Sequence, residues 1–228
     1  MKFLQLIILA LSLLLVNAND CNDHCYNGDS CTPNYTTPIK SCCDLRIYSS
    51  ARVSSGVYKM SMGTFGTANV YCDMTTADGG WIVIQRNRKD SSVSFNRNWR
   101  EYEDGFGDFS TDFWYGLEAM HTLTQNDQWE MRVGSANEEY KLTVGGYTGG
   151  DDDYFTTGSE PANGRMFKTL DNDNDVWNER NCAVSWKSGW WFHSCYDINP
   201  NTQPPRYNYP NVAINIEVKI RPNNCIVR

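Results

Sequence analysis

The clearest chemistry in this sequence lies at residues 171–175, which read Asp-Asn-Asp-Asn-Asp. Alternating carboxylates and amides offer the oxygen atoms that Ca²⁺ prefers, and Ca²⁺ takes roughly six to eight of them. An EF-hand is excluded, because Val176 and Cys182 stand where such a loop needs Gly and Glu. Two interpretations remain: a calcium loop of another kind, or a solvated turn whose Asp and Asn side chains bond their own backbone.

The beginning of the chain predicts a secretory signal peptide at residues 1–18. Lys2 provides the positive charge, an apolar run extends from Phe3 to Val16, and Ala18 is a small residue at a plausible cleavage site. The run is shorter than the roughly 20 apolar residues that a membrane-spanning helix needs. We therefore expect a secreted, extracellular protein that begins near Asn19 and has no membrane span.

Composition narrows the classes of partner. Nine cysteines in a secreted chain indicate disulfides rather than metal thiolates. A formal net charge of −7 without a basic run argues against nucleic acid as a binding partner. The three histidines are accompanied by neither a Gly-x-Ser-x-Gly nor a His-Glu-x-x-His motif, so we predict that the protein is not an enzyme. The sequon that begins at Asn34 predicts glycosylation there.

The character of the sequence changes near residue 42. Residues 19–41, called the leader here, are polar and rich in cysteine, whereas short apolar segments separated by glycine follow. We expect strands at residues 57–58, 70–72, 81–85, 129–133, 140–144 and 212–220, and a short helix at 113–123. In the last strand alternate apolar residues are expected to share one face. The predicted fold is α+β, mainly antiparallel sheet with short helices and long loops.

An ordered series of motifs resembles the fibrinogen-related domain family, which has a fibrinogen C-terminal-like fold. The motifs include Gly79-Gly80-Trp81, Phe113-Trp114, Val144-Gly145-Gly146-Tyr147, Asn181-Cys182-Ala183 and Gly189-Trp190-Trp191. The resemblance covers residues 42–222, and a tail at residues 223–228 contains Cys225. Ficolins, tachylectin-like lectins, angiopoietins and tenascins share this domain, so the resemblance implies recognition rather than catalysis.

The resemblance implies two disulfides and a metal site. The disulfides would join Cys42 to Cys72 and Cys182 to Cys195. The cofactor would be Ca²⁺, held by the carboxylates of Asp173 and Asp175 and by the backbone carbonyl of Trp177. The backbone of Glu179 is a further candidate, although the stretch before Cys182 is one residue longer than the family pattern.

The resemblance also implies a ligand pocket beside the calcium loop. In acetyl-binding members this pocket depends on a cis peptide before the second-disulfide cysteine, which corresponds to Ser194–Cys195 here. The candidate ligand-binding residues are Phe192, His193, Ser194, Cys195, Tyr196, Tyr207 and Tyr209. We interpret Trp190 and Trp191 as core residues, because large aromatic side chains are mostly buried.

The sequence departs from the family pattern in the pocket region and in its cysteine count. Tyr196 replaces the usual His, and the domain is shortened near residues 133–140 and 196–218. After the two implied disulfides, five cysteines remain, namely Cys21, Cys25, Cys31, Cys43 and Cys225. An odd remainder in a secreted chain predicts an intermolecular bond or a free thiol. We hypothesise that Cys225 bridges back to the leader and that the leader links chains into a disulfide-bonded homo-oligomer.

Two functions fit these observations. The first is a secreted, calcium-dependent lectin that binds acetylated or other glycans in innate defence. The alternative is an extracellular signalling or matrix protein that binds a protein receptor through the same domain. Neither a collagen-like nor a coiled-coil arm is present to separate them.

Overall fold

The computed structural model describes residues 38–49, 53–125, 129–145, 153–174, 176, 179–208 and 210–225. The predicted signal peptide, almost all of the leader and the sequon at Asn34 lie outside these residues, as do Asp175, Trp177 and Tyr209. The domain boundaries proposed from the sequence therefore stay predictions.

The main sheet is antiparallel and has six strands, with the order β1-β2-β3-β5-β4 and β10 also paired to β3. The strands are β1 (Gly56–Ser61), β2 (Thr67–Asp73), β3 (Trp81–Arg88), β4 (Phe106–Gly107), β5 (Phe113–Trp114) and β10 (Asn215–Ile220). Consecutive residues Ile82, Val83 and Ile84 of β3 are all buried. Such continuous burial is expected of a strand that is covered on both faces. The predicted α+β fold with a mainly antiparallel sheet is confirmed.

Four short helices, α1 (Cys42–Tyr48), α2 (Trp99–Asp104), α3 (Leu117–Thr124) and α4 (Cys182–Trp186), lie around the sheet together with the 3₁₀ turns η1 (Gly63–Phe65), η2 (Thr76–Asp78) and η3 (Ala136–Glu138). Local capping explains where several of them begin. Ser41 and Asp44 form a capping box at α1, and Asn98 and Glu101 form one at α2. Such side chains satisfy backbone N–H groups that a helix leaves without internal partners.

The predicted helix at 113–123 begins later than expected. Phe113 and Trp114 form β5 and pair with both β3 and β4, so their backbone groups are used in the sheet. Gly116 then turns the chain at φ 103°, a value that favours glycine, and α3 starts at Leu117. The apolar spacing was therefore correct for Leu117 and Met120, while sheet pairing overrode it before them.

The remaining strands form two small hairpins, β6 (Met131–Val133) with β7 (Leu142–Val144), and β8 (Ile198–Asn199) with β9 (Arg206–Tyr207). The last predicted strand is shorter than expected, because regular pairing of β10 begins only at Asn215. A bulge between Val218 and Lys219 interrupts its alternation. Ile214, just before β10, is 82% exposed, whereas Ile220 is buried.

Three disulfides are present among the described residues. Cys42–Cys72 and Cys182–Cys195 are the pairs that the family resemblance implies. The third joins Cys43 to Cys225 across 182 positions, so the hypothesis that Cys225 bridges to the leader is corrected. Cys43 is the residue after Cys42 in α1, and this places Cys225 beside that helix.

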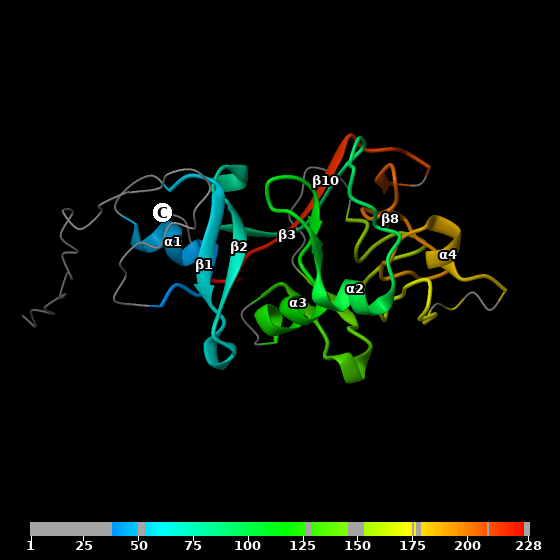
Figure 1. The fold of residues 1–228 in the computed structure, drawn as a ribbon, viewed down its shortest axis with the longest axis horizontal. Helices are drawn as coiled ribbons and strands as arrows, with labels where there is room; N and C mark the ends of the chain where they lie inside the picture. Colours follow the sequence, from blue (N-terminus) through cyan, green and yellow to red (C-terminus); the bar gives the residue numbers. More distant parts are fainter. Residues whose placement is uncertain are drawn as a thin grey trace, which may run out of the picture.

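The arrangement in space separates two ends of the molecule (Figure 1). Helix α1 with β1 and β2 lies at one end, α4 and β8 lie at the other, and β3 and β10 run between them. Toward the second end, an aromatic core gathers Tyr102, Trp114, Phe167 and Trp191 with ring centroids 5.1–5.8 Å apart. None of the helices in the described parts of the chain is long and apolar enough to cross a membrane.

Candidate functional site

The acidic run begins with residues that are committed to the fold. The Asp171 carboxylate accepts a bond from the Trp99 backbone N–H at 2.9 Å, at the first residue of α2, and another from the Thr169 hydroxyl at 2.7 Å. The side-chain amides of Asn172 and Asn174 point inward, and both donate to the Glu139 carboxylate. The Asn174 amide also donates to the Phe167 carbonyl. These three members of the run therefore hold the loop in place.

Asp173, which lies between the two inward asparagines, is exposed. Glu179 is also exposed. Asp175 and Trp177 lie outside the described residues, and within the described part no three His, Cys, Asp or Glu side chains gather as a cation site. Calcium binding therefore stays a prediction.

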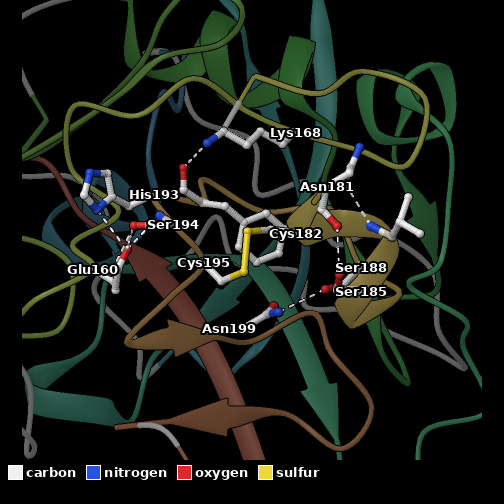
Figure 2. The surroundings of a disulfide bond; sticks show 12 residues. Glu160, Lys168, Asn181, Cys182, Ser185, Ser188, His193, Ser194, Cys195 and Asn199 are labelled. Atoms are coloured by element: carbon white, nitrogen blue, oxygen red, sulfur yellow. Dashed lines mark hydrogen bonds and ion pairs between the residues drawn. A yellow bond between two sulfur atoms is a disulfide. The ribbon is translucent and has the colours of Figure 1, made fainter. Parts of the chain in front are cut away.

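Residues 192–197, called the 192–197 loop here, are fixed to the scaffold from several directions. Cys195 is bonded to Cys182, the first residue of α4, and Asn181 caps that helix by accepting the Val184 N–H at 3.0 Å. The His193 N–H donates to the Cys195 carbonyl at 2.9 Å. Figure 2 shows the disulfide between α4 and this loop.

Lys168 braces the same loop from within the core. Its side chain is almost fully buried, and its ammonium donates to the carbonyl of Phe192 (Figure 2). Its backbone pairs with Trp190 through two bonds of 3.1 Å. Because a buried ammonium needs nearby acceptors, this contact ties the position of the Phe192 carbonyl to the core.

On the solvent side of the 192–197 loop, three donors meet the Glu160 carboxylate (Figure 2). His193 Nδ1 lies 2.8 Å from Glu160 Oε2, and the Ser194 backbone N–H donates to the same oxygen at 2.7 Å. The Ser194 hydroxyl lies 3.0 and 3.1 Å from the two carboxylate oxygens. Partial burial pushes the pKa of Glu160 upward, but the Ser194 bonds and the nearby His193 outweigh it, so the pKa lies below its usual value.

The predicted pocket residues fall into two groups. His193 is partly exposed and Ser194 is exposed, so both are accessible at the surface. Phe192 and Tyr196 are buried, and the Tyr196 ring packs edge-on against Trp186 at 4.9 Å. These two rings support the loop from below in this conformation. The expectation that Trp190 and Trp191 are core residues is confirmed, with exposures of 0% and 1%.

The Ser194–Cys195 peptide differs from the expectation. Among the described residues, the cis peptide bond is Gln203–Pro204, and Ser194–Cys195 is trans.

The shortened segment after Cys195 is held by buried amides of β3, which sequence reasoning missed. Asn87 donates to the carbonyls of Pro200 and Thr202 at 2.8 and 2.9 Å, and Gln85 donates to Pro200 at 3.2 Å. Asn201 in turn donates to the Gly189 carbonyl at 2.9 Å. Two amide residues, Gln85 and Asn87, within a strand that is largely buried were the available signal, because buried amides need partners.

Tyr207 lies elsewhere, in a groove of about 820 Å³ that follows β10. Apolar side chains of the groove include Trp81, Phe155 and Ile216. Ser194 and His193 do not line it. The structure thus separates two surfaces that the sequence had combined: the 192–197 loop and the groove along β10.

Comparisons with known proteins agree on the domain type. The family described as "Fibrinogen beta and gamma chains, C-terminal globular domain" matches residues 38–135 and 130–215. Ryncolin-4 from Cerberus rynchops is 35% identical over 195 residues, which are 77% of this chain and 53% of that protein. Tenascin-R from Gallus gallus is 33% identical over 206 residues, which are 82% of this chain and 13% of that protein. The chain therefore spans about half of the first relative and a smaller share of the second.

Solved structures show the same architecture. The fibrinogen-like globe domain of human ANGPTL2 matches with a TM-score of 0.70 and 30% identity, covering 82% of this chain and 100% of that one. A lamprey fibrin D-dimer complexed with the peptide Gly-His-Arg-Pro-amide matches with a TM-score of 0.62 and 26% identity, covering 85% of this chain and 68% of that one.

Proposed function

Because the chain belongs to the fibrinogen C-terminal domain family, we propose that it is a secreted recognition protein that binds acetylated or other glycans at the 192–197 loop. The observation that carries this proposal is the exposed Ser194, whose N–H and O–H donate to the partly exposed Glu160 carboxylate from a backbone fixed by a disulfide and by Lys168. A preorganised pair of donors is what a small site needs to orient a polar ligand group.

Calcium is part of the same proposal. Asp173 and Asp175 would hold the ion, with backbone carbonyls of Trp177 and Glu179 completing the protein ligands. The ion would rigidify the stretch between Asp173 and Cys182, the cysteine bonded to the 192–197 loop. This link supports the expectation that ligand binding depends on calcium.

The test is binding of the secreted protein to acetylated resin and to a glycan array, first with calcium and then with chelator. We expect chelator to abolish binding, and Asp173→Ala and Asp175→Ala to do the same. Asp108→Ala is the matched control, because Asp108 is also exposed but lies in the turn between β4 and β5. No binding by a folded wild-type protein in either condition would refute the glycan proposal.

A second candidate function is binding of a protein or peptide partner in the groove along β10. Its volume of about 820 Å³ and its apolar side chains favour this alternative. The lamprey fibrin structure was solved with a peptide ligand, which supports a peptide as the occupant class. Tyr207→Ala would weaken such a complex and leave glycan binding at the 192–197 loop intact, so one variant separates the two functions.

A further inference from the structure

Glu160 makes a contact that the fold does not need for capping. At α1, α2 and η3 a carboxylate that bonds a Ser or Asn backbone N–H belongs to a capping box three residues away, as Glu138 does with Ser135. Glu160 instead meets Ser194 from a distance of 34 positions in the chain, and no helix begins at Ser194.

The 192–197 loop has other supports for its backbone. The Cys182–Cys195 disulfide, the Lys168 contact with the Phe192 carbonyl and the bond from His193 N to the Cys195 carbonyl all act without Glu160. Removal of the Glu160 side chain would therefore leave the donors of His193 and Ser194 in place but without this acceptor.

The backbone and the side chain of Glu160 are held independently. The Glu160 N–H donates to the Asp197 carboxylate at 2.7 Å, which fixes the backbone beside the loop. The side chain is 27% exposed, so it can turn into solvent without leaving a buried charge behind. Rotation of one side chain is then sufficient to open the three donors.

We propose that His193 and Ser194 form a cradle for the carboxylate of a ligand, and that Glu160 occupies this cradle in the free protein as a displaceable internal competitor. This inference rests on the proposed function, because it names the ligand class for the same loop: glycans that carry a carboxylate.

The geometry favours a carboxylate over a neutral acyl oxygen. Glu160 Oε2 accepts hydrogen bonds from His193 Nδ1 and from the Ser194 N–H. The Ser194 hydroxyl lies within 3.1 Å of both carboxylate oxygens. A carboxylate presents two oxygens with several lone pairs, whereas a carbonyl presents one oxygen. Bonds to an ionised acceptor are also the stronger ones.

The experiment follows the Ser194 backbone amide in the NMR spectrum of ¹⁵N-labelled full chain during titration with sodium acetate. Wild type and Glu160→Ala are compared, with sodium chloride at equal ionic strength as the salt control. A tethered carboxylate competes at an effective concentration in about the millimolar range, so we expect acetate to bind Glu160→Ala more tightly than wild type, by about twofold if its dissociation constant is about 1 mM and by about tenfold if it is about 0.1 mM. Glu138→Ala is the matched control and should behave as wild type.

Two further arms keep the inference open to refutation. Glu160→Gln keeps the side-chain shape and should bind acetate more tightly than wild type, which guards against an effect of lost packing in Glu160→Ala. Acetamide, which is neutral and offers one acyl oxygen as its acceptor, should bind Glu160→Ala more weakly than acetate does. Equal acetate affinity in wild type and both Glu160 variants, or stronger binding of acetamide, would overturn the proposal.

The outcome is independent of the glycan test. Tighter acetate binding by Glu160→Ala than by wild type, together with no glycan binding, would support the cradle and refute the glycan assignment. Glycan binding that calcium controls, without any acetate response at Ser194, would support the proposed function and overturn the cradle.

Discussion

Removal of the Cys182–Cys195 disulfide should affect recognition more than stability, and the comparison with Cys42–Cys72 makes this testable. Both bridges are replaced by alanine pairs, Cys182→Ala with Cys195→Ala and Cys42→Ala with Cys72→Ala. The first bridge lies between α4 and the 192–197 loop, and the second joins α1 to β2 at the other end of the molecule (Figure 1).

The expected magnitudes come from the lengths of the closed loops. In the chain-entropy account a disulfide restricts the unfolded chain, and the restriction grows with the logarithm of loop length. The separation of 13 positions between Cys182 and Cys195 corresponds to about 3 kcal/mol of unfolding free energy. The separation of 30 positions between Cys42 and Cys72 corresponds to about 3.7 kcal/mol. The bridge at the recognition loop should therefore be the less costly one to remove.

The local effect should have the opposite order. Without its disulfide the 192–197 loop loses its covalent link to α4, and the donors of His193 and Ser194 lose their fixed position. We expect hydrogen exchange of the loop amides to accelerate strongly in the Cys182/Cys195 variant and to change little in the Cys42/Cys72 variant. Glycan binding, where present, should follow the exchange data rather than the stability.

Urea unfolding gives the two free energies, and hydrogen–deuterium exchange with mass spectrometry gives the local protection. The reasoning is refuted if the Cys182/Cys195 variant is the less stable of the two, or if its loop amides keep their wild-type protection. Either result would mean that noncovalent contacts, and not the disulfide, hold the loop.

Three further predictions concern packing, pH and assembly. Gly189→Ala should lower the unfolding free energy by about 2–4 kcal/mol. Its Cβ would lie 2.6 Å from the Tyr102 ring and would disturb the bond from Gly189 N to the Tyr102 hydroxyl. Urea unfolding measures this loss, and the control Gly145→Ala should cost far less because the space around its Cβ is open. Burial pushes the pKa of Asp73 upward, but bonds from Lys219 and neighbouring Thr groups hold it below its ordinary 3.8. The stability that this carboxylate contributes is therefore present above about pH 4 and is lost as the pH falls further. Urea unfolding between about pH 6 and pH 2 should show this loss in wild type and much less of it in Asp73→Asn. Three disulfides use six of the nine cysteines and leave three in the leader. Non-reducing electrophoresis should therefore show a covalent dimer or larger oligomer that a reductant converts to monomer. Monomer under both conditions would contradict this prediction.

The sequence alone was sufficient for the fold class, and it supplied a hypothesis for the site. Short apolar segments separated by glycine predicted strands at β2, β3, β6 and β7, because each strand's pattern is carried by adjacent residues. The acidic run at 171–175 and the motif around Cys182 are also local signals. Together with their order along the chain they indicated the family and the Cys182–Cys195 bridge.

The tertiary structure decided everything that depends on how distant segments meet. The sequence contained no signal that Glu160 would reach Ser194 across 34 positions, or that Asn87 would hold the Pro200 carbonyl across 113 positions. Cys225 was expected to reach the leader because domain termini often lie close together. Packing of β10 against β3 brings it to Cys43 instead. Local pattern specifies helices and strands because their bonds are short in sequence. Partners across long loops depend on the path of the whole chain, and only the folded structure supplies that path.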